Sequence, residues 1–265
     1  MTFDPNPSEW VVHPFVAEDG AFDYATYRAI QIRRNRNRAH RGWIHQGTAT
    51  GLAKYLTAIV PHPTFGLCHG TRNGNEQRWF RKALPGCEVW GTEISPDAAS
   101  IPHTVVWDFH EAKPEWVGAC DFIYSNSFDH SYDPSKSLAA WMSCLKPDGV
   151  CFIDWMCLGT AKPPDHDPFA ATLPVLVAFI NDLGGNDFGV ADVFQTPFNE
   201  STVVSYVGRV KHVQHKRIVF KKVGGIKVRV ATVVIRPRVT QKFQVPPEWA
   251  TGHLPKMQVP AVGAV

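Results

Sequence analysis

Short apolar runs alternate with amphipathic segments through the middle of the chain. Between the runs, 76–84 and 135–145 carry apolar residues at helical spacing. The runs themselves are rich in Val, Ile, Phe, Trp and Cys, which is typical of buried strands; they cover 64–69, 88–92, 103–107, 121–124 and 149–155. Strands and helices that alternate in this way predict βαβ units and a doubly wound, mostly parallel α/β sheet.

The two ends of the chain follow a different pattern. The first residues are Pro-rich and irregular, and two helices are predicted next, from a cap at Asp23 to about Arg41 and over 48–60. A further helix is expected at 169–183, followed by strand-rich sequence to about Val239. The predicted organisation is an irregular and helical extension at 1–60, a main domain at 61–243 and a Pro-rich extended tail at 244–265.

The end of the main domain, 201–243, predicts closing strands and an added basic hairpin. In 226–230, aliphatic residues alternate with Lys227 and Arg229, which places the cations on one face of a strand and the aliphatic side chains on the other. The preceding Val223-Gly224-Gly225 can adopt the positive φ angles that a tight hairpin turn needs.

Composition favours a folded protein that keeps its thiols reduced. Of 265 residues, 44% are hydrophobic, which argues against a disordered chain. The six cysteines lie largely in apolar stretches without a CxxC pair. The N-terminal segment lacks the charged and apolar regions of a signal peptide, and the apolar run near 173–180 is shorter than the ~20 residues that span a bilayer. We therefore expect a cytoplasmic protein without a transmembrane segment.

The small net charge of +3 hides two basic segments. Residues 28–41 and 201–247 contain no Asp or Glu, and together they hold 6 + 11 = 17 of the 27 Lys and Arg residues. Such segments are either solvated faces or attract an anion: a phosphorylated substrate, a nucleic acid, an anionic membrane or an acidic partner.

The loop after the first strand and the ends of the next two strands carry candidate ligand-binding residues. Gly70 and Gly74 permit a tight turn and close backbone approach before a helix N-terminus. Glu93 ends the second strand 19 residues after Gly74, where a carboxylate can accept hydrogen bonds from two ribose hydroxyls, and Asp108 follows the third strand, placed to reach an adenine amino group. In an open parallel sheet these strand ends meet at one edge, where ligands bind.

With these residues the chain resembles a class I S-adenosylmethionine-dependent methyltransferase of the type 11 group, over about 62–157. Three further motifs carry the resemblance: Glu93-Ile94-Ser95-Pro96, the segment 121–130 that ends in Asp129-His130, and the turn Leu145-Lys146-Pro147-Asp148-Gly149. The resemblance implies a Rossmann-like sheet of seven strands and S-adenosyl-L-methionine as cofactor. The cofactor-binding residues that it implies are His69, Gly70, Arg72, Gly74, Glu93, Ile94, Asp108, Phe109 and Asn126.

The sequence identifies the residues around the methyl acceptor less specifically than those around the cofactor. His130, with Asp129, is the candidate for a general base, because an imidazole titrates near neutrality and can accept a hydroxyl proton. No HxH or HExxH spacing lies beside the cysteines, so no metal site is predicted. The resemblance favours O-methylation of a small molecule, a sugar or a lipid-linked glycan, with an anionic acceptor compatible with the basic segments. No Asn/Asp-Pro-Pro-Tyr stretch follows the fourth strand, which argues against a nucleic-acid acceptor.

Two departures from the family pattern keep alternatives open. Cys68 stands where the family usually has an acid, and Arg72 where it has a glycine. Arg72 could pair with the methionine carboxylate of the cofactor. The alternative is a non-catalytic binding or assembly protein that retains the fold and uses its basic segments as contacts. A dinucleotide enzyme fits less well, because GxGxxG is absent. The oligomeric state is left open.

Overall fold

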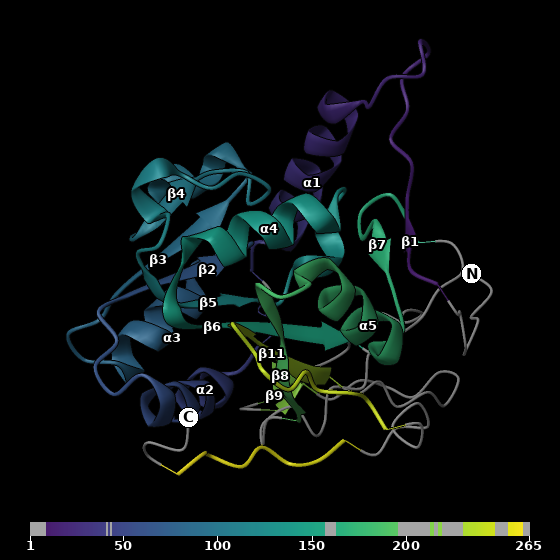
Figure 1. Cartoon of the computed structure of the whole chain (residues 1–265). Coiled ribbons are helices and arrows are strands. Elements are labelled where there is room, and N and C mark those ends of the chain that lie inside the picture. The colour runs from purple at the N-terminus through teal and green to yellow at the C-terminus, as the bar shows by residue number, and fades with distance from the viewer. Residues whose placement is uncertain are drawn as a thin grey trace.

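The computed structural model describes residues 9–40, 42, 44–156, 163–195, 213–214, 217–218, 230–246 and 254–261. Its centre is a seven-stranded sheet with the order β4-β3-β2-β5-β6-β11-β8 (Figure 1). The strands are β2 (Phe65–His69), β3 (Glu88–Glu93), β4 (Thr104–Val106), β5 (Cys120–Ser125), β6 (Leu145–Met156), β8 (Phe188–Phe194) and β11 (Val230–Pro237). β2 to β6 run parallel, and β11 lies antiparallel between β6 and β8. The predicted doubly wound, mostly parallel sheet is confirmed.

Helices cover both faces of the sheet, because side chains on successive strand residues point to opposite sides. Leu67 packs in one core with α4 (Pro134–Cys144) and α5 (Leu173–Gly184). Its neighbour Cys68 packs in a second core with α2 (Gln46–Ile59) and α3 (Asn75–Ala83). Both strand faces are therefore buried, which explains the nearly continuous apolar runs of the sequence.

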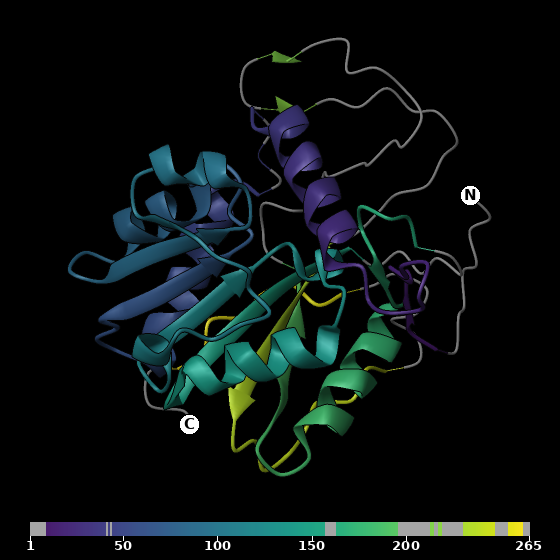
Figure 2. The same ribbon diagram turned by 90° about the horizontal axis from the view of Figure 1, so that it is seen from above.

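The remaining helix, α1 (Tyr24–Arg38), crosses the carboxyl ends of the parallel strands, as Figure 2 shows. The predicted cap at Asp23 is confirmed, since its carboxylate accepts a hydrogen bond from the backbone N–H of Thr26 at 2.9 Å. Tyr27, Gln31 and Asn35 lie four residues apart on the buried face of α1. The helical extension predicted at the N-terminus thus lies over the edge of the sheet where the candidate residues end their strands.

The prediction of a helix from 169 is wrong in its first turn. Phe169–Ala170 forms a short strand, β7, which pairs antiparallel with β1 (Val11–Val12). α5 begins only at Leu173, with Pro174 in its first turn. Proline fits there because the first helical N–H groups have no intrahelical acceptor, and its ring disfavours helical backbone in the preceding residue.

The turn predicted at 145–149 is a bulge inside β6. Leu145 pairs with Cys120 and Val150 with Phe122, so four residues of β6 face a single residue of β5. Lys146 reaches from this bulge to both carboxylate oxygens of Asp121 at 2.9 Å. The Asp121 carboxylate also accepts hydrogen bonds from the backbone N–H groups of Thr64 and Phe65 at the amino end of β2, so its role is structural.

The C-terminal part contains a small antiparallel pair, β9 (Val213–Gln214) with β10 (Arg217–Ile218). The predicted hairpin turn at Val223-Gly224-Gly225 lies outside the described residues. In the described part of the tail, a bridge between Gln195 and Lys256 joins the chain back to the end of β8.

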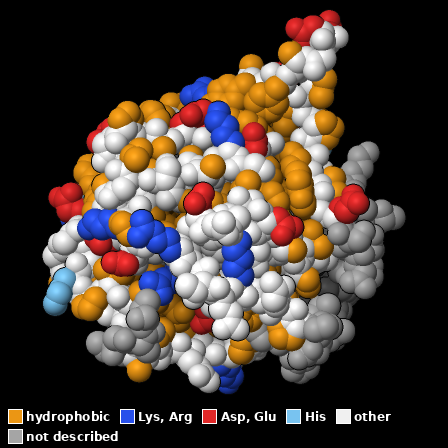
Figure 3. Space-filling model, in the orientation of Figure 1, with side chains coloured by type: hydrophobic (Ala, Val, Ile, Leu, Met, Phe, Trp, Pro, Cys, Tyr) orange, Lys and Arg blue, Asp and Glu red, His pale blue; other side chains and the backbone are white. Residues whose placement is uncertain are grey.

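Three 3-10 helices complete the described elements: η1 (Pro96–Ser100), η2 (Pro114–Trp116) and η3 (Phe128–His130). On the face seen in Figure 3, Lys and Arg side chains are interspersed with Asp and Glu. Among the helices that the structure describes, none is long and apolar enough to cross a bilayer.

Candidate functional site

The loop after β2 brings the backbone of Gly70 against the end of β5. Gly70 and Gly74 have φ angles of 70° and 74°, and Arg72 between them has φ 47°. A Cβ atom at Gly70 would lie 2.5 Å from the Cβ of Ser127, so only glycine permits this approach. Ser127 in turn donates a hydrogen bond to the Gly70 carbonyl at 3.2 Å. The backbone of Gly70 therefore lies close to Ser127 at the end of β5, and it also lines the pocket.

Glu93, at the end of β3, holds two loops of the site. One carboxylate oxygen accepts the backbone N–H of Arg72 at 3.0 Å, and the other accepts that of Ser95 at 3.1 Å. The side chain is buried, with 7% of its surface exposed. Each carboxylate oxygen has a second lone pair, so Glu93 keeps capacity to accept hydrogen bonds from a ligand.

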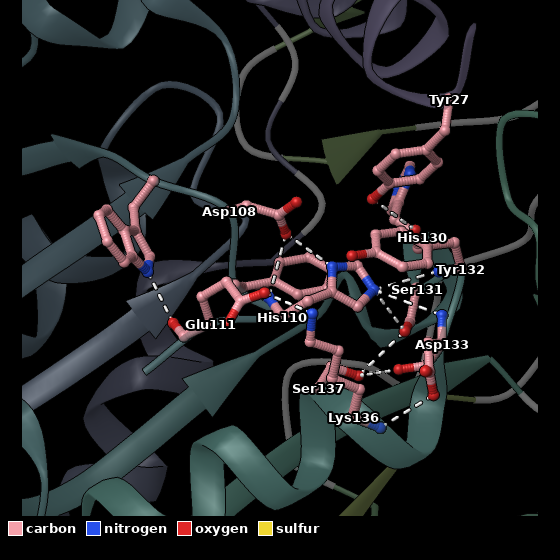
Figure 4. Close-up of polar contacts among 12 residues, drawn as sticks. Tyr27, Asp108, His110, Glu111, His130, Ser131, Tyr132, Asp133, Lys136 and Ser137 are labelled. Atoms are coloured by element: carbon pink, nitrogen blue, oxygen red, sulfur yellow. Dashed lines mark hydrogen bonds and ion pairs between the residues drawn. The ribbon is translucent and has the colours of Figure 1, made fainter. Parts of the chain in front are cut away.

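Asp108 lies at the centre of a polar network after β4 (Figure 4). Its Oδ1 accepts the backbone N–H of His110 at 3.0 Å and lies 2.6 Å from the Nδ1 of the same residue, while its Oδ2 accepts the hydroxyl of Tyr24 at 2.8 Å. Burial opposes ionisation of Asp108, but these hydrogen bonds outweigh it and hold the pKa of the carboxyl below its usual value. Tyr24 comes from α1, so the helix caps the place expected for the adenine.

His110 orients this network and was not predicted. Its Nε2 lies 2.9 Å from the Ser131 hydroxyl and 3.2 Å from the backbone N–H of Tyr132, whose ring stacks on the imidazole at 3.7 Å. Because a backbone N–H only donates, Nε2 is the acceptor and Nδ1 carries the hydrogen that faces Asp108. This Asp-His-Ser order resembles a hydrolytic triad, yet Ser131 is completely buried and the Nε2 lone pair is occupied, so the network is structural.

His69 is placed away from the pocket. Its ring is buried, stacks on Trp141 with 4.9 Å between centroids, and lies 2.8 Å from the Thr92 hydroxyl through Nδ1. Burial lowers the pKa of His69 to about 3, so the imidazole is neutral. Its side chain packs beneath the glycine loop, and the backbone of the next residue, Gly70, faces the pocket instead.

One pocket unites most of the predicted residues at the carboxyl ends of the strands. The lining includes α1 residues that the sequence did not identify, and the cavity beneath α1 is only about 50 Å³. The predicted residues in its lining are Gly70, Arg72, Glu93, Ile94, Asp108, Phe109 and His130, and those outside it are His69, Gly74, Asn126 and Asp129. The residues that sequence reasoning missed are the four from α1: Tyr27, Gln31, Arg34 and Asn35. A nucleoside-sized ligand needs several hundred Å³, which is more than this cavity offers in the present arrangement of α1 and its side chains.

A cluster of ionisable side chains borders this pocket. Single ligand atoms from Asp129, His130 and Asp167 lie within 4.8 Å of one another. His130 is held from α1, since its Nδ1 is 2.9 Å from the Gln31 side-chain oxygen and its carbonyl accepts the Tyr27 hydroxyl at 3.1 Å. Burial raises the pKa of Asp129 to about 6, with His130 opposing and Asp167 adding to the rise. Asp167 gives no signal in the sequence because it lies far along the chain, just before β7.

Comparisons with known proteins identify the fold. No family model and no curated protein sequence matches the chain. Among solved structures, it is similar to the 1,6-didemethyltoxoflavin-N1-methyltransferase of Burkholderia thailandensis, solved with 1,6-didemethyltoxoflavin and S-adenosylhomocysteine (TM-score 0.54, 16% identity, 88% of this chain and 97% of that one). It is also similar to the plantazolicin methyltransferase BpumL with S-adenosylhomocysteine (TM-score 0.56, 10% identity, 80% and 95%). The chain therefore has the fold of class I S-adenosylmethionine-dependent methyltransferases.

Proposed function

We propose that this protein is an S-adenosylmethionine-dependent methyltransferase that acts on a small-molecule acceptor. The observation that carries the proposal is one pocket at the carboxyl ends of the strands, lined by the glycine loop, by Glu93 and by Asp108. The glycine loop, Glu93 and Asp108 follow three successive parallel strands, β2, β3 and β4. This is the order that a nucleoside with an amino-acid tail requires. Similar folds solved with S-adenosylhomocysteine support this reading.

The residues present fit the cofactor. Gly70 and Arg72 are assigned to its methionine part, Glu93 to the ribose hydroxyls, and Asp108 with Phe109 to the adenine. When bound, the sulfonium supplies an activated methyl group, so the protein contributes mainly positioning and exclusion of water. α1 covers the pocket and provides that exclusion. Gly74, Asn126 and His69 act behind the loop by shaping it.

Glu76 places a carboxyl group near Cys68, where the family usually has an acid. The Cys68 side chain points into the core shared with α2 and α3. The carboxyl of Glu76, in the first turn of α3, is buried and acts electrostatically on the Cys68 thiol, whose pKa burial already raises. A carboxyl group is thus retained near the loop, although it comes from a different element.

The acceptor end of the pocket is assigned to Asp129 and His130, which supports transfer to a hydroxyl of a small molecule, sugar or lipid-linked glycan. A hydroxyl loses its proton as it is methylated, and these two ionisable groups follow the strand end beside Ser127. A ring nitrogen is the alternative acceptor, because the Burkholderia protein of similar fold is an N1-methyltransferase.

Calorimetric titration with S-adenosylhomocysteine tests the proposal. We expect saturable binding by the parent and a 5- to 150-fold weaker Kd for Glu93→Ala, because lost hydrogen bonds to the ribose cost on the order of 1–3 kcal/mol. The matched control is Glu88→Ala, which removes an exposed carboxylate from the first position of the same strand. An unchanged Kd for Glu93→Ala contradicts the ribose assignment, and no binding by the folded parent favours the non-catalytic alternative.

A further inference from the structure

We propose that Asp129, His130 and Asp167 bind a divalent metal cation of the Mn²⁺ or Mg²⁺ class beside the pocket. The three side chains come from two segments: η3, directly after β5, supplies Asp129 and His130, and the segment before β7 supplies Asp167. The sequence predicted no metal site, because motifs such as HxH and HExxH place their ligands close together in the chain. Here the fold brings Asp167 to the adjacent pair Asp129-His130, which lies 37 positions earlier in the chain.

The geometry of the three donors suits a single ion. Their ligand atoms all lie within 4.8 Å of one another. Metal–ligand bonds of about 2.0–2.2 Å place neighbouring donors roughly 3 Å apart and opposite donors roughly 4.2 Å apart. Small side-chain rotations therefore bring the three atoms around one ion. These three side chains fill three coordination positions, so further positions are left for water or for a substrate oxygen.

Gln31 on α1 selects the histidine tautomer that a metal needs. The side-chain nitrogen of Gln31 donates to the carbonyl of His166 at 3.4 Å, so its oxygen faces the Nδ1 of His130 at 2.9 Å. An amide oxygen only accepts, which means that Nδ1 carries the hydrogen. The Nε2 lone pair of the neutral imidazole then points toward the carboxylates. A histidine whose other ring N–H is held by an oxygen acceptor is typical of metal ligands.

The distance between His130 and Asp167 also favours a bound ion. The Nε2 of His130 lies 3.8 Å from the Oδ1 of Asp167, which is beyond hydrogen-bond length, so a proton on Nε2 would not bridge the two groups. That separation falls between the distances expected for neighbouring and opposite ligands on one ion. His166 lies 3.6 Å from the other oxygen of Asp167, while its own Nδ1 is 2.9 Å from Asp165.

The charges match a dication. Two carboxylates and a neutral imidazole carry −2, which a divalent cation neutralises. Arg72 and Arg34 act electrostatically on Asp129 and Asp167, respectively. The imidazoles of His130 and His166 lie 3.8 and 3.6 Å from the two carboxylate oxygens of Asp167. Carboxylates with one imidazole suit Mn²⁺, Mg²⁺ or Zn²⁺, and the predominance of oxygen favours the first two.

The role of the ion rests on the proposed function. His130 lines the pocket, so open positions of the ion would face an acceptor bound there. A hydroxyl bound to a divalent cation loses its proton more readily, because the cation stabilises the resulting oxyanion. In this arrangement His130 is a metal ligand, and the acceptor proton passes to solvent rather than to the imidazole.

Titration of the full chain with Mn²⁺, followed by calorimetry and by the EPR signal of free Mn²⁺, tests the site. We expect one saturable site in the parent, at least tenfold weaker binding in Asp129→Asn and Asp167→Asn, and a change of less than threefold in Asp165→Asn. Asp165 is a matched control because it is the neighbouring acid and contacts His166 rather than the three ligands. No saturable binding by the parent, or equal binding by all variants, overturns the proposal.

Two further measurements separate this site from folding and from the cofactor. Gln31→Leu should weaken Mn²⁺ binding 10- to 100-fold. Gln31→Glu keeps the oxygen acceptor and should bind Mn²⁺ as tightly as the parent does. A purely structural role predicts that both variants change the Tm and leave Mn²⁺ binding intact. S-adenosylhomocysteine affinity should be the same in the parent and in Asp167→Asn, so the metal site and the proposed cofactor site fail or succeed independently.

Discussion

At the scale of single residues, the most unusual group is the buried carboxyl of Glu76. Only 5% of its surface is exposed, and burial raises its pKa to about 7 from an ordinary value of 4.5. The backbone at Glu76 and the charge of Arg72 oppose this rise without cancelling it. The folded protein therefore holds a proton on Glu76 through the pH range in which the unfolded chain has released it.

This proton makes stability depend on pH. Between about pH 4.5 and pH 7 the folded state binds more protons than the unfolded state, so the free energy of unfolding falls as the pH rises. We expect Glu76→Gln to be more stable than the parent at pH 8, by about 1–3 kcal/mol, and similar to it at pH 5. Urea unfolding at both pH values measures this, with exposed Glu88→Gln as control. A variant less stable than the parent at pH 8 would show that the ionised carboxylate stabilises the fold.

At the scale of elements, α1 controls access to the pocket. It is attached to the strand ends by the Tyr24–Asp108 hydrogen bond, by the Tyr27 bond to the His130 carbonyl, and by a bidentate ion pair between Arg36 and Asp97 at 2.8 and 2.9 Å. The Arg36 ion pair is about half exposed, so solvent screens it and it adds little. If Asp108 contacts the adenine as proposed, a cofactor replaces the hydrogen bond from Tyr24 to this charged carboxylate.

Removal of the Tyr24 hydroxyl should speed cofactor binding. A hydrogen bond to a charged group contributes about 1.5–3 kcal/mol, so Tyr24→Phe should raise the association rate for S-adenosylhomocysteine by about 10- to 150-fold. Stopped-flow tryptophan fluorescence measures the rate. Tyr55→Phe is the control, because it removes a similar Tyr–Asp bond, to Asp192 at 3.0 Å, away from the pocket. Equal rates in the parent and Tyr24→Phe would mean that α1 does not limit entry.

At the scale of the whole molecule, β11 joins the edge strand β8 to the parallel strands of the sheet. It pairs with β6 on one side and with β8 on the other, and Val233, Val234 and Ile235 are completely buried. Thr232 also donates to Asp154 at 2.6 Å, next to the Tyr124 hydroxyl that contacts the same carboxylate. β8 and β11 are therefore part of the core, and β8 has no described strand partner other than β11.

Two truncations test this arrangement and the predicted boundary of the tail. A chain that ends at Gln195 lacks β11 and should show no cooperative thermal unfolding, because β6 and β8 lose their shared partner. A chain that ends at Pro246 keeps β11 and loses, among the described contacts, the packing of Leu254 and Met257 and the bridge to Gln195, so its Tm should fall by only about 2–4 °C. Circular dichroism during heating measures both. Cooperative unfolding of the shorter chain would show that the fold does not require β11.

Much of the fold and half of the site follow from local pattern. Alternation of apolar runs with amphipathic segments determines the parallel sheet, because both faces of its strands are buried. Glu93 and Asp108 were found because the carboxyl ends of parallel strands meet at one edge whatever the detailed packing. The helix predicted from 169 failed locally, since a proline in the first turn sets the start of α5 more strongly than the apolar pattern does.

The tertiary structure alone decided what faces those strand ends. Tyr24 and Asp108 are 84 positions apart, and Gln31 and His130 are 99 apart. Periodicity identifies the buried side of α1 but carries no information about the surface on which that side packs. The cover of the pocket, the orientation of His130 and its approach to Asp167 depend on that packing, because long-range contacts are selected by shape and hydrogen bonding between whole elements. The sequence determined which residues end the strands, and the folded structure determined which side chains meet there.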